Sequence, residues 1–282
     1  MKIAISSDSS LDLTRELIKK YDIHVVPFSI VMGEKQFLDG EVTSKDIFAY
    51  TAETGKLART SAVNEAQSEQ HFAELLTQYD AIIHFTISSD MSASFQNATL
   101  AAKKFKNVYV IDSRTLSTGV ALEAIYAKKL ADQGLEPLEI INRINERIPF
   151  VQASFGIEAV NYLFKGGRCS GLAALGANLL RIRPQIIVKD GKMVQGKKFR
   201  GPMIRWVKDY AEETLREFSN PDHSIVFITY SSATDEAVEW CKNRLKEAGF
   251  KDVYNTNAGG TVSCHCGPGT LGILYFNDGD RE

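Results

Sequence analysis

Two short apolar runs decide the fold: AIIHFTI at residues 81–87 and NVYVID at 107–112. Each has the length of one strand and is apolar on both faces, the pattern of a strand inside a parallel sheet that helices cover on both sides. Residues 94–105 between the runs have a helical pattern, and so do residues 116–133 after them. This alternation of strand and helix predicts a three-layer α/β domain.

The same alternation extends back to the N-terminus. We expect strands at 2–6 and 23–30, and helices at 12–21, 44–55 and 64–79. Pro27 marks an edge or a bend in the second of these strands, because proline cannot donate a hydrogen bond to a neighbouring strand. Residues 1–150 are therefore predicted to form one α/β domain.

A second α/β unit is predicted from residue 151 to 282. Its expected strands are 150–157, 224–230 and 270–276, its helices are 170–180, 202–218 and 232–248, and a hairpin occupies 184–198. The Asp190-Gly191 pair supplies the turn of that hairpin. No linker rich in Gly, Ser or Pro separates the two halves, so we expect them to share a wide interface.

The composition is that of an ordinary soluble globular chain, with 44% hydrophobic and 24% charged residues among 282, which argues against a mainly disordered protein. No apolar run approaches the roughly 18 residues needed to span a bilayer, and the start MKIAISSDSS lacks a secretory signal. Four cysteines are too few for a disulfide framework. We therefore expect a cytoplasmic protein with reduced thiols and no stable membrane insertion.

The net charge of −2 conceals one strongly basic segment. Residues 159–208 contain eleven Lys or Arg and a single acid, Asp190, so this segment carries +10 and the rest of the chain −12. Such an excess can attract an anionic partner, and it also fits a solvated face spread around a domain. The chain as a whole is mildly acidic and has no nucleic-acid-binding motif, so we expect no nucleic acid partner.

Three segments resemble cofactor-binding or metal-binding motifs, but each lacks a feature that its motif requires. GPGTLG at 267–272 has dinucleotide-site spacing but runs into a predicted strand with only ten residues left. GKMVQGKK at 191–198 has Lys198 where a P-loop needs Ser or Thr. Cys264-His265-Cys266 places three potential ligands in a row without the second cluster that zinc sites use. We therefore expect no cofactor and no metal ion, and with no G-x-S-x-G sequence we assign no catalytic residue.

Polar loops follow several predicted strands at their carboxyl ends, where open α/β sheets bind ligands. These loops are 7–10, 60–61, 88–94 and 112–117. Hydroxyls and free backbone N–H groups at helix N-termini favour an anion. Ordinary helix capping explains any one of these serines, but four such loops in one half-chain favour a shared anion pocket.

Taken in order, these loops and the segments that follow resemble the DegV family of fatty-acid-binding proteins over nearly the whole chain. The stretches that carry the resemblance are ISSDSSLDL at 5–13, ARTSAVN at 58–64, TISSDMSASFQNA at 86–98, VIDSRTLSTG at 110–119, residues 161–192 and GGTVSCHCGPGTLG at 259–272. The resemblance implies an N-terminal three-layer domain with a parallel sheet and a C-terminal domain with a mixed sheet. It also implies one long-chain fatty acid buried between the two domains.

The same resemblance implies roles for individual residues. Thr60 and Ser92 would hydrogen-bond the carboxylate of the fatty acid, with Ser61 in the same loop and His265 nearby. Proteins of this kind deliver the fatty acid to a kinase that makes acyl-phosphate for phospholipid synthesis. Arg168, in the sequence GGR, would lie near the head-group opening and contact that kinase.

Physical chemistry fits such a carrier. Burial of each methylene contributes about 0.8 kcal/mol, so a roughly 16-carbon tail could contribute about 10 kcal/mol before the costs of association. An unpaired carboxylate inside the protein would cost several kcal/mol. The hydroxyls of Thr60 and Ser92 and the imidazole of His265 can satisfy it without a permanent ion pair, which leaves the acid available to a second protein.

Two classes of function remain open from the sequence. The ordered motifs and the lack of a nucleophile–base pattern favour a lipid carrier without catalysis of its own. The Ser/Thr-rich loops, His265 and the basic segment also fit a hydrolase or transferase that acts on an acyl or phosphate ester. An unrelated binding module is a third possibility.

Overall fold

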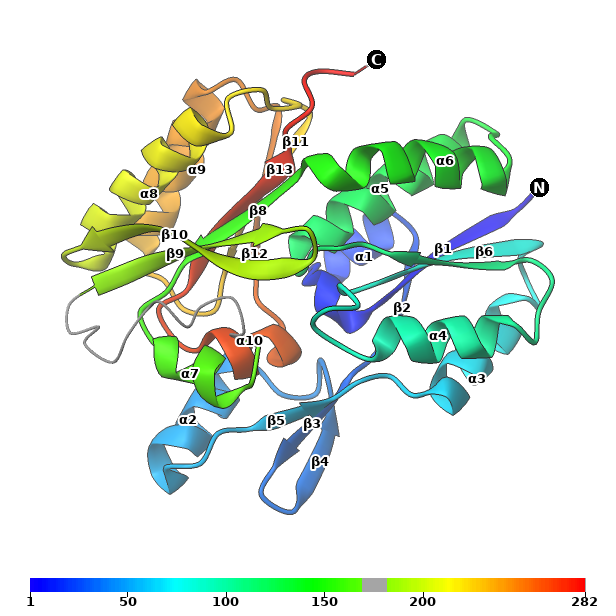
Figure 1. Cartoon of the computed structure of the whole chain (residues 1–282), viewed down its shortest axis with the longest axis horizontal. Helices are drawn as coiled ribbons and strands as arrows, with labels where there is room; N and C mark the ends of the chain where they lie inside the picture. The colour runs from blue at the N-terminus through cyan, green and yellow to red at the C-terminus, as the bar shows by residue number, and fades with distance from the viewer. Residues whose placement is uncertain (169–181, 282) are drawn as a thin grey trace.

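The computed structural model describes residues 1–168 and 182–281 (Figure 1). A four-stranded sheet comes from the first half of the chain and a six-stranded sheet from the second half. A small three-stranded sheet lies at one end of the molecule (Figure 1). The helix expected at 170–180 lies outside the described residues, as do Cys169 and Arg181.

The four-stranded sheet is parallel throughout, with strand order β2-β1-β6-β7. Its strands are β1 (Ile3–Asp8), β2 (Ile23–Val26), β6 (Ala81–Thr86) and β7 (Val108–Asp112). One face packs against α3 (Glu65–Leu75) and α4 (Ser94–Ala102), and the other against α5 (Thr118–Asp132) and α6 (Pro137–Arg147). This arrangement confirms the predicted three-layer α/β domain. Helix α1 (Arg15–Lys20) connects β1 to β2.

The six-stranded sheet has the order β10-β9-β8-β13-β11-β12, and only β11 and β12 are parallel to each other. Its strands are β8 (Val151–Gly156), β9 (Ile182–Lys189), β10 (Lys192–Arg200), β11 (Ile225–Tyr230), β12 (Asp252–Asn257) and β13 (Leu271–Phe276). Helices α8 (Met203–Glu217) and α9 (Asp235–Glu247) cover one face around Trp206 and Tyr210. The mixed C-terminal sheet is therefore confirmed, and the predicted hairpin corresponds to β9 and β10.

Helix α5 lies between the two large sheets (Figure 1). It contacts β1 and β6 of the parallel sheet and β8, β11 and β13 of the mixed sheet. Ten of its fifteen residues are buried. One continuous apolar cluster therefore runs from Ile5 and Phe85 in the first half to Phe155 and Leu274 in the second.

Several elements of the structure differ from the sequence prediction or were not predicted. The strand expected at 23–30 is interrupted at Pro27 and forms β2 and then β3 (Ser29–Met32). Strand β3 pairs with β4 (Lys35–Leu38) and β5 (Arg59–Ser61) in the small antiparallel sheet, beside α2 (Ser44–Thr54). Four further elements were not predicted from the sequence: the short helices α7 (Val160–Lys165) and α10 (Gly260–Cys266), helix α6 and strand β12.

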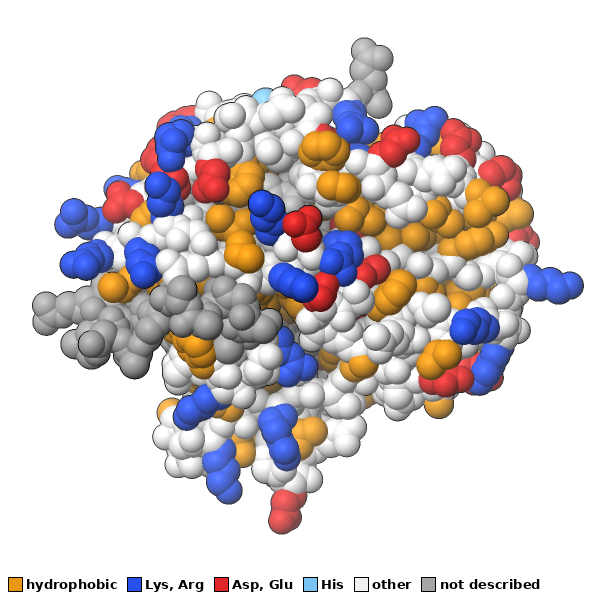
Figure 2. All heavy atoms as spheres, in the orientation of Figure 1, with side chains coloured by type: hydrophobic (Ala, Val, Ile, Leu, Met, Phe, Trp, Pro, Cys, Tyr) orange, Lys and Arg blue, Asp and Glu red, His pale blue; other side chains and the backbone are white. Residues whose placement is uncertain are grey.

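The basic segment is partly neutralised by local ion pairs. Figure 2 shows its side chains on the face that includes β10 and α8, with acidic side chains between them. Arg183 pairs with Glu158 at 3.0 Å, and Lys197 lies 3.7 Å from Glu213. This part of the segment therefore has the character of a solvated face. Within residues 1–168 and 182–281, no helix is long and apolar enough to cross a membrane.

Glu123 is an unusual residue at the centre of α5. It is fully buried, and neither carboxyl oxygen has a hydrogen-bond partner among the described residues. Burial, together with the nearby charge of Asp112, raises the pKa of Glu123 well above its ordinary value. The folded protein therefore holds this carboxyl neutral at pH values where the unfolded chain ionises it.

We predict that Glu123→Gln stabilises the protein relative to the wild type, and that this difference in stability grows as the pH rises. Because the folded-state pKa is raised, the native side chain destabilises the fold increasingly above the unfolded pKa of about 4.3. The variant should match the wild type near about pH 4 and gain on the order of 1 kcal/mol or more near about pH 7.5. Urea unfolding across this pH range measures the difference. Glu146→Gln, at an exposed position on α6, is the control, and a gain that is independent of pH would contradict the prediction.

Candidate functional site

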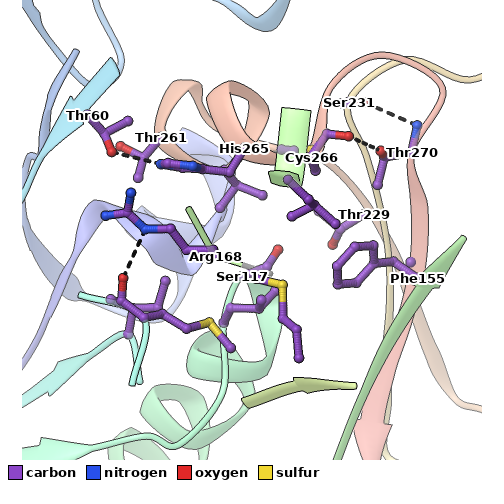
Figure 3. Close-up of a pocket in the computed structure, with 18 of the residues that line it drawn as sticks. Thr60, Ser117, Phe155, Arg168, Thr229, Ser231, Thr261, His265, Cys266 and Thr270 are labelled. Atoms are coloured by element: carbon purple, nitrogen blue, oxygen red, sulfur yellow. Dashed lines mark hydrogen bonds between the residues drawn. The ribbon is translucent and has the colours of Figure 1, made fainter. Parts of the chain in front are cut away.

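A mainly apolar pocket lies between the loops of the first half and the sheet of the second (Figure 3). About 840 Å³ of space lies between its lining atoms, and this volume includes open solvent. Its apolar walls are formed by Phe28, Ile87, Met91, Leu116, Phe155, Leu163, Met193 and Leu274. Thr60, Thr261, His265 and Arg168 lie together on the side of the pocket away from Phe155, and this group is called the polar side below (Figure 3). The hydroxyl residues Thr229, Ser231 and Thr270 line the pocket on the same side as Phe155.

The polar side of the pocket is built on a contact between β5 and α10. Thr60 Oγ1 on β5 lies 2.9 Å from His265 Nε2 on α10. Ser61 is the next residue on β5, and successive strand residues point to opposite faces. Ser61 is accordingly exposed and does not line the pocket. The structure thus brings Thr60 and His265 together and leaves Ser61 outside the site.

Ser92 also lines the pocket, from the loop between β6 and α4. Its hydroxyl contacts Ser94 Oγ at 3.3 Å and accepts a hydrogen bond from Ser94 N at 3.2 Å. The loop follows the carboxyl end of a parallel strand, the position at which ligands bind in sheets of this type. Ser92, Thr60 and His265 therefore come from three separate segments and line one pocket.

Arg168 adds a positive charge at the same side of the pocket. Its guanidinium group donates to Met91 O at 3.3 Å and to Gly166 O at 2.6 Å, and Figure 3 shows it beside Thr60 and His265. The residue is exposed and lines the pocket as well. The site therefore contains a cation in addition to the neutral donors expected from the sequence.

His265 is a neutral imidazole at physiological pH. Burial, together with the charge of Arg168, lowers its pKa to about 4. Its Nδ1 atom has no hydrogen-bond partner within the described residues. A Cβ atom at Gly166 would lie 2.5 Å from that nitrogen, and Gly167 adopts a left-handed φ of +71°. The two glycines before Arg168 thus let the end of α7 close over the His265 ring.

Helix α10 is held in place by two aspartates from the first half of the chain. Asp12 Oδ1 accepts a hydrogen bond from Gly259 N at 2.8 Å. Asp39 accepts from Gly260 N at 2.8 Å and from Thr261 N at 3.2 Å. Burial raises the pKa of Asp12 to about 8. These contacts occupy the first backbone N–H groups of α10 and fix the helix against the N-terminal loops.

The side chains around the pocket are better suited to binding than to nucleophilic chemistry. Burial raises the pKa of both Cys264 and Cys266 to about 12, so their thiols stay protonated and are weak nucleophiles. Thr60 and His265 have the spacing of a nucleophile and a base. The low pKa of His265 makes it a poor base, and no described side chain orients its Nδ1 atom as a catalytic triad would.

Metal-ligating residues do not cluster in the described part of the chain, where no group of three His, Cys, Asp or Glu side chains could hold an ion. The apolar walls of the pocket can accept an apolar molecule, and the hydroxyl groups and the Arg168 guanidinium can accept an anionic end on that molecule. Sequence reasoning overlooked several polar residues of the pocket, namely Thr229, Ser231, Thr261 and Thr270. For Thr261 a signal was present in the sequence. Its spacing of four residues from His265 was the available signal, since residues at i and i+4 share a helix face.

Comparison with known proteins agrees with this architecture. The model of the DegV family, described as "Uncharacterised protein, DegV family", matches residues 2–278. The chain belongs to the DegV family. A DegV domain-containing protein of Clostridium acetobutylicum is 30% identical over 280 residues, which cover 98% of each chain. A fatty acid-binding protein of Thermotoga maritima is 28% identical over 282 residues, which cover 97% of each chain.

Solved DegV structures have the same fold. A fatty-acid-binding DegV family protein from Thermus thermophilus superimposes with a TM-score of 0.90 at 25% identity, covering 98% of this chain and 99% of that one. Another solved structure, of a Thermotoga maritima protein and reported to reveal a fatty acid binding function, gives a TM-score of 0.84 at 25% identity, with 98% and 99% covered.

We predict that Gly166→Ala displaces the His265 ring in this DegV protein. The added methyl group would overlap Nδ1, so the ring should move toward solvent and its pKa should rise from about 4 toward about 6.5. NMR titration of the His265 ring resonances, assigned with His265→Ala, measures the change. Lys165→Ala, at an exposed position on the same turn, should leave the pKa unchanged. An unaltered pKa in Gly166→Ala would show that α7 does not hold the ring.

Proposed function

We propose that this DegV-family protein binds one long-chain fatty acid and acts as its carrier in the cytoplasm. The acyl tail occupies the apolar pocket, and the carboxylate lies at the side where Thr60, Ser92 and His265 converge. The observation that supports the proposal is that three distant segments, carrying Thr60, Ser92 and His265, line one mainly apolar pocket, with Thr60 and His265 in contact. The fatty acid binding of the Thermus and Thermotoga relatives supports the choice of ligand.

The electrostatics of the pocket suit an ionised acid that must later leave. Hydroxyl donors, among them Thr60 oriented by the His265 imidazole, can satisfy the carboxylate oxygens, which would otherwise cost several kcal/mol to bury. The Arg168 side chain is exposed as well as lining the pocket, so its charge is screened by solvent. Such a site lowers the cost of burying the carboxylate without the tight, desolvated ion pair that would hold the ligand permanently.

We further propose that the protein presents its fatty acid to a kinase that forms acyl-phosphate for phospholipid synthesis. The proposal extends the family resemblance, and the placement of Arg168 supports it. Because this exposed residue lines the polar side of the pocket, the carboxylate lies near a surface that a second protein can contact. A guanidinium group is also suited to phosphate recognition.

A hydrolase or transferase acting on an acyl ester is the second candidate, and the 2.9 Å contact between Thr60 and His265 favours it. The depressed pKa of His265 argues against this candidate, because a general base works best with a pKa near the operating pH. Ester turnover by the isolated protein that is lost in His265→Ala would establish the enzyme and overturn the carrier.

We predict that the protein purified from a bacterial host carries close to one fatty acid per chain. Extraction under denaturing conditions followed by mass spectrometry measures the lipid. The double variant Thr60→Val/Ser92→Ala should retain much less, because two donors to the carboxylate are lost at about 1–3 kcal/mol each. Ser61→Ala, beside Thr60 on the outward face of β5, is the matched control. A lipid-free extract from well-folded wild-type protein would count decisively against the carrier.

We predict that Arg168→Gln lowers acyl-phosphate formation at least tenfold in the presence of a fatty acid kinase, since an interaction with a charged group contributes about 1.5–3 kcal/mol. Reactions are started with equal amounts of lipid-loaded protein, so that any change in lipid affinity is removed from the comparison. Lys165→Gln, an exposed neutralisation three residues earlier, should react like the wild type. Equal rates for Arg168→Gln and the wild type would refute the role of Arg168 in presentation.

A further inference from the structure

Thr261 is a buried residue of the pocket whose hydroxyl makes no hydrogen bond within the described part of the protein. It lies in the first turn of α10, lines the pocket and is 4% exposed. Its Oγ1 atom has no hydrogen-bond partner within residues 1–168 and 182–281. An unpaired buried hydroxyl costs free energy and is rare in native proteins. The hydroxyl therefore has the environment of a group that is completed by a ligand.

The usual structural reasons for a threonine at this position do not apply. A threonine near the start of a helix commonly caps a backbone N–H with its side chain. Here the cap residue is Gly259, without a side-chain hydrogen bond, and the aspartates take the N–H groups. Asp39 accepts the backbone N–H of Thr261 itself. The backbone is thus fixed by the aspartates, and the hydroxyl remains free.

The neighbours of Thr261 are the head-group residues. Thr261 and His265 are four residues apart on α10 and share one face of the helix. Helix α10 packs against β5, which carries Thr60, and Figure 3 draws Thr60, Thr261 and His265 beside the Arg168 guanidinium group. The unpaired hydroxyl is therefore next to the contact that forms the polar side of the pocket.

The tautomer of His265 determines how many donors face the ligand. Its Nδ1 atom is closed off by Gly166 and has no described partner. A buried N–H group without an acceptor is rarer than an under-satisfied acceptor, so the proton belongs on Nε2. Nε2–H then donates to Thr60 Oγ1, and the Thr60 hydroxyl proton is free to donate to a ligand. A carboxylate, with about four lone-pair sites, can also accept from Ser92 and from one further donor.

We propose that Thr261 is this further donor, a positioning residue that hydrogen-bonds the ligand's carboxylate and selects the free acid over its neutral esters. The inference rests on the proposed function and extends it to the chemical class of the ligand. An ester has only one strong acceptor oxygen and no charge, so it cannot use all three hydroxyls. Hydrogen bonds to a charged acceptor are about twice as strong as neutral ones, which favours the ionised acid.

The test compares two ligands with the same tail, palmitate and its methyl ester, on three proteins. Thr261→Val removes the hydroxyl and keeps the branched shape, whereas Thr261→Ser keeps the hydroxyl. Thr261→Val should weaken palmitate binding about tenfold or more and change methyl ester binding by no more than about twofold. Thr261→Ser should bind palmitate within about threefold of the wild type. Thermal unfolding of each variant shows whether the fold is intact.

Two results would overturn the inference while leaving the proposed function intact. A loss in Thr261→Val that is equal for acid and ester would assign Thr261 to packing. Unchanged palmitate binding in this variant would show that the hydroxyl does not reach the carboxylate. A well-folded wild-type protein that binds neither ligand would instead overturn the proposed function, and the inference with it.

Discussion

The pocket depends on the hydrogen bonds that Asp12 and Asp39 accept from backbone N–H groups at the start of α10. A helix of seven residues has little stability of its own, so its position is set by what it packs against. The two aspartates fix α10 from the first half of the chain, although the helix belongs to the second. His265 is thereby brought within 2.9 Å of Thr60, 205 residues away in sequence.

The rest of the architecture explains why the space beside this contact is apolar. Helix α5 is buried between two sheets, and the shared core continues to the loops at the carboxyl ends of β6 and β7. Ile87 and Leu116 in those loops line the pocket together with Phe155 and Leu274 of the mixed sheet. The pocket therefore lies where two covered sheets meet, and β5, α10 and the loop before α4 each contribute polar residues to its lining.

The sequence predicted most of the parts of this structure that have a strong period or a long apolar run, although the amphipathic helix α6 was missed. The runs at 81–87 and 107–112 became β6 and β7, and polar loops were correctly expected beyond them. Strand β5 has three residues and α10 begins with a glycine, so neither shows a period, and both are held by tertiary contacts. The same limit explains Ser61 and Thr261. The face of a three-residue strand and the one free hydroxyl in a short helix are settled only by their partners in space.

A crystal structure of the protein with bound palmitate tests the central claim most directly. The account predicts one acyl chain in the pocket, its carboxylate within hydrogen-bonding distance of Thr60 and Ser92, and its tail extending toward Phe155 and Leu274. A pocket filled by the protein's own side chains, or a fatty acid whose carboxylate lies away from Thr60 and Ser92, would contradict it.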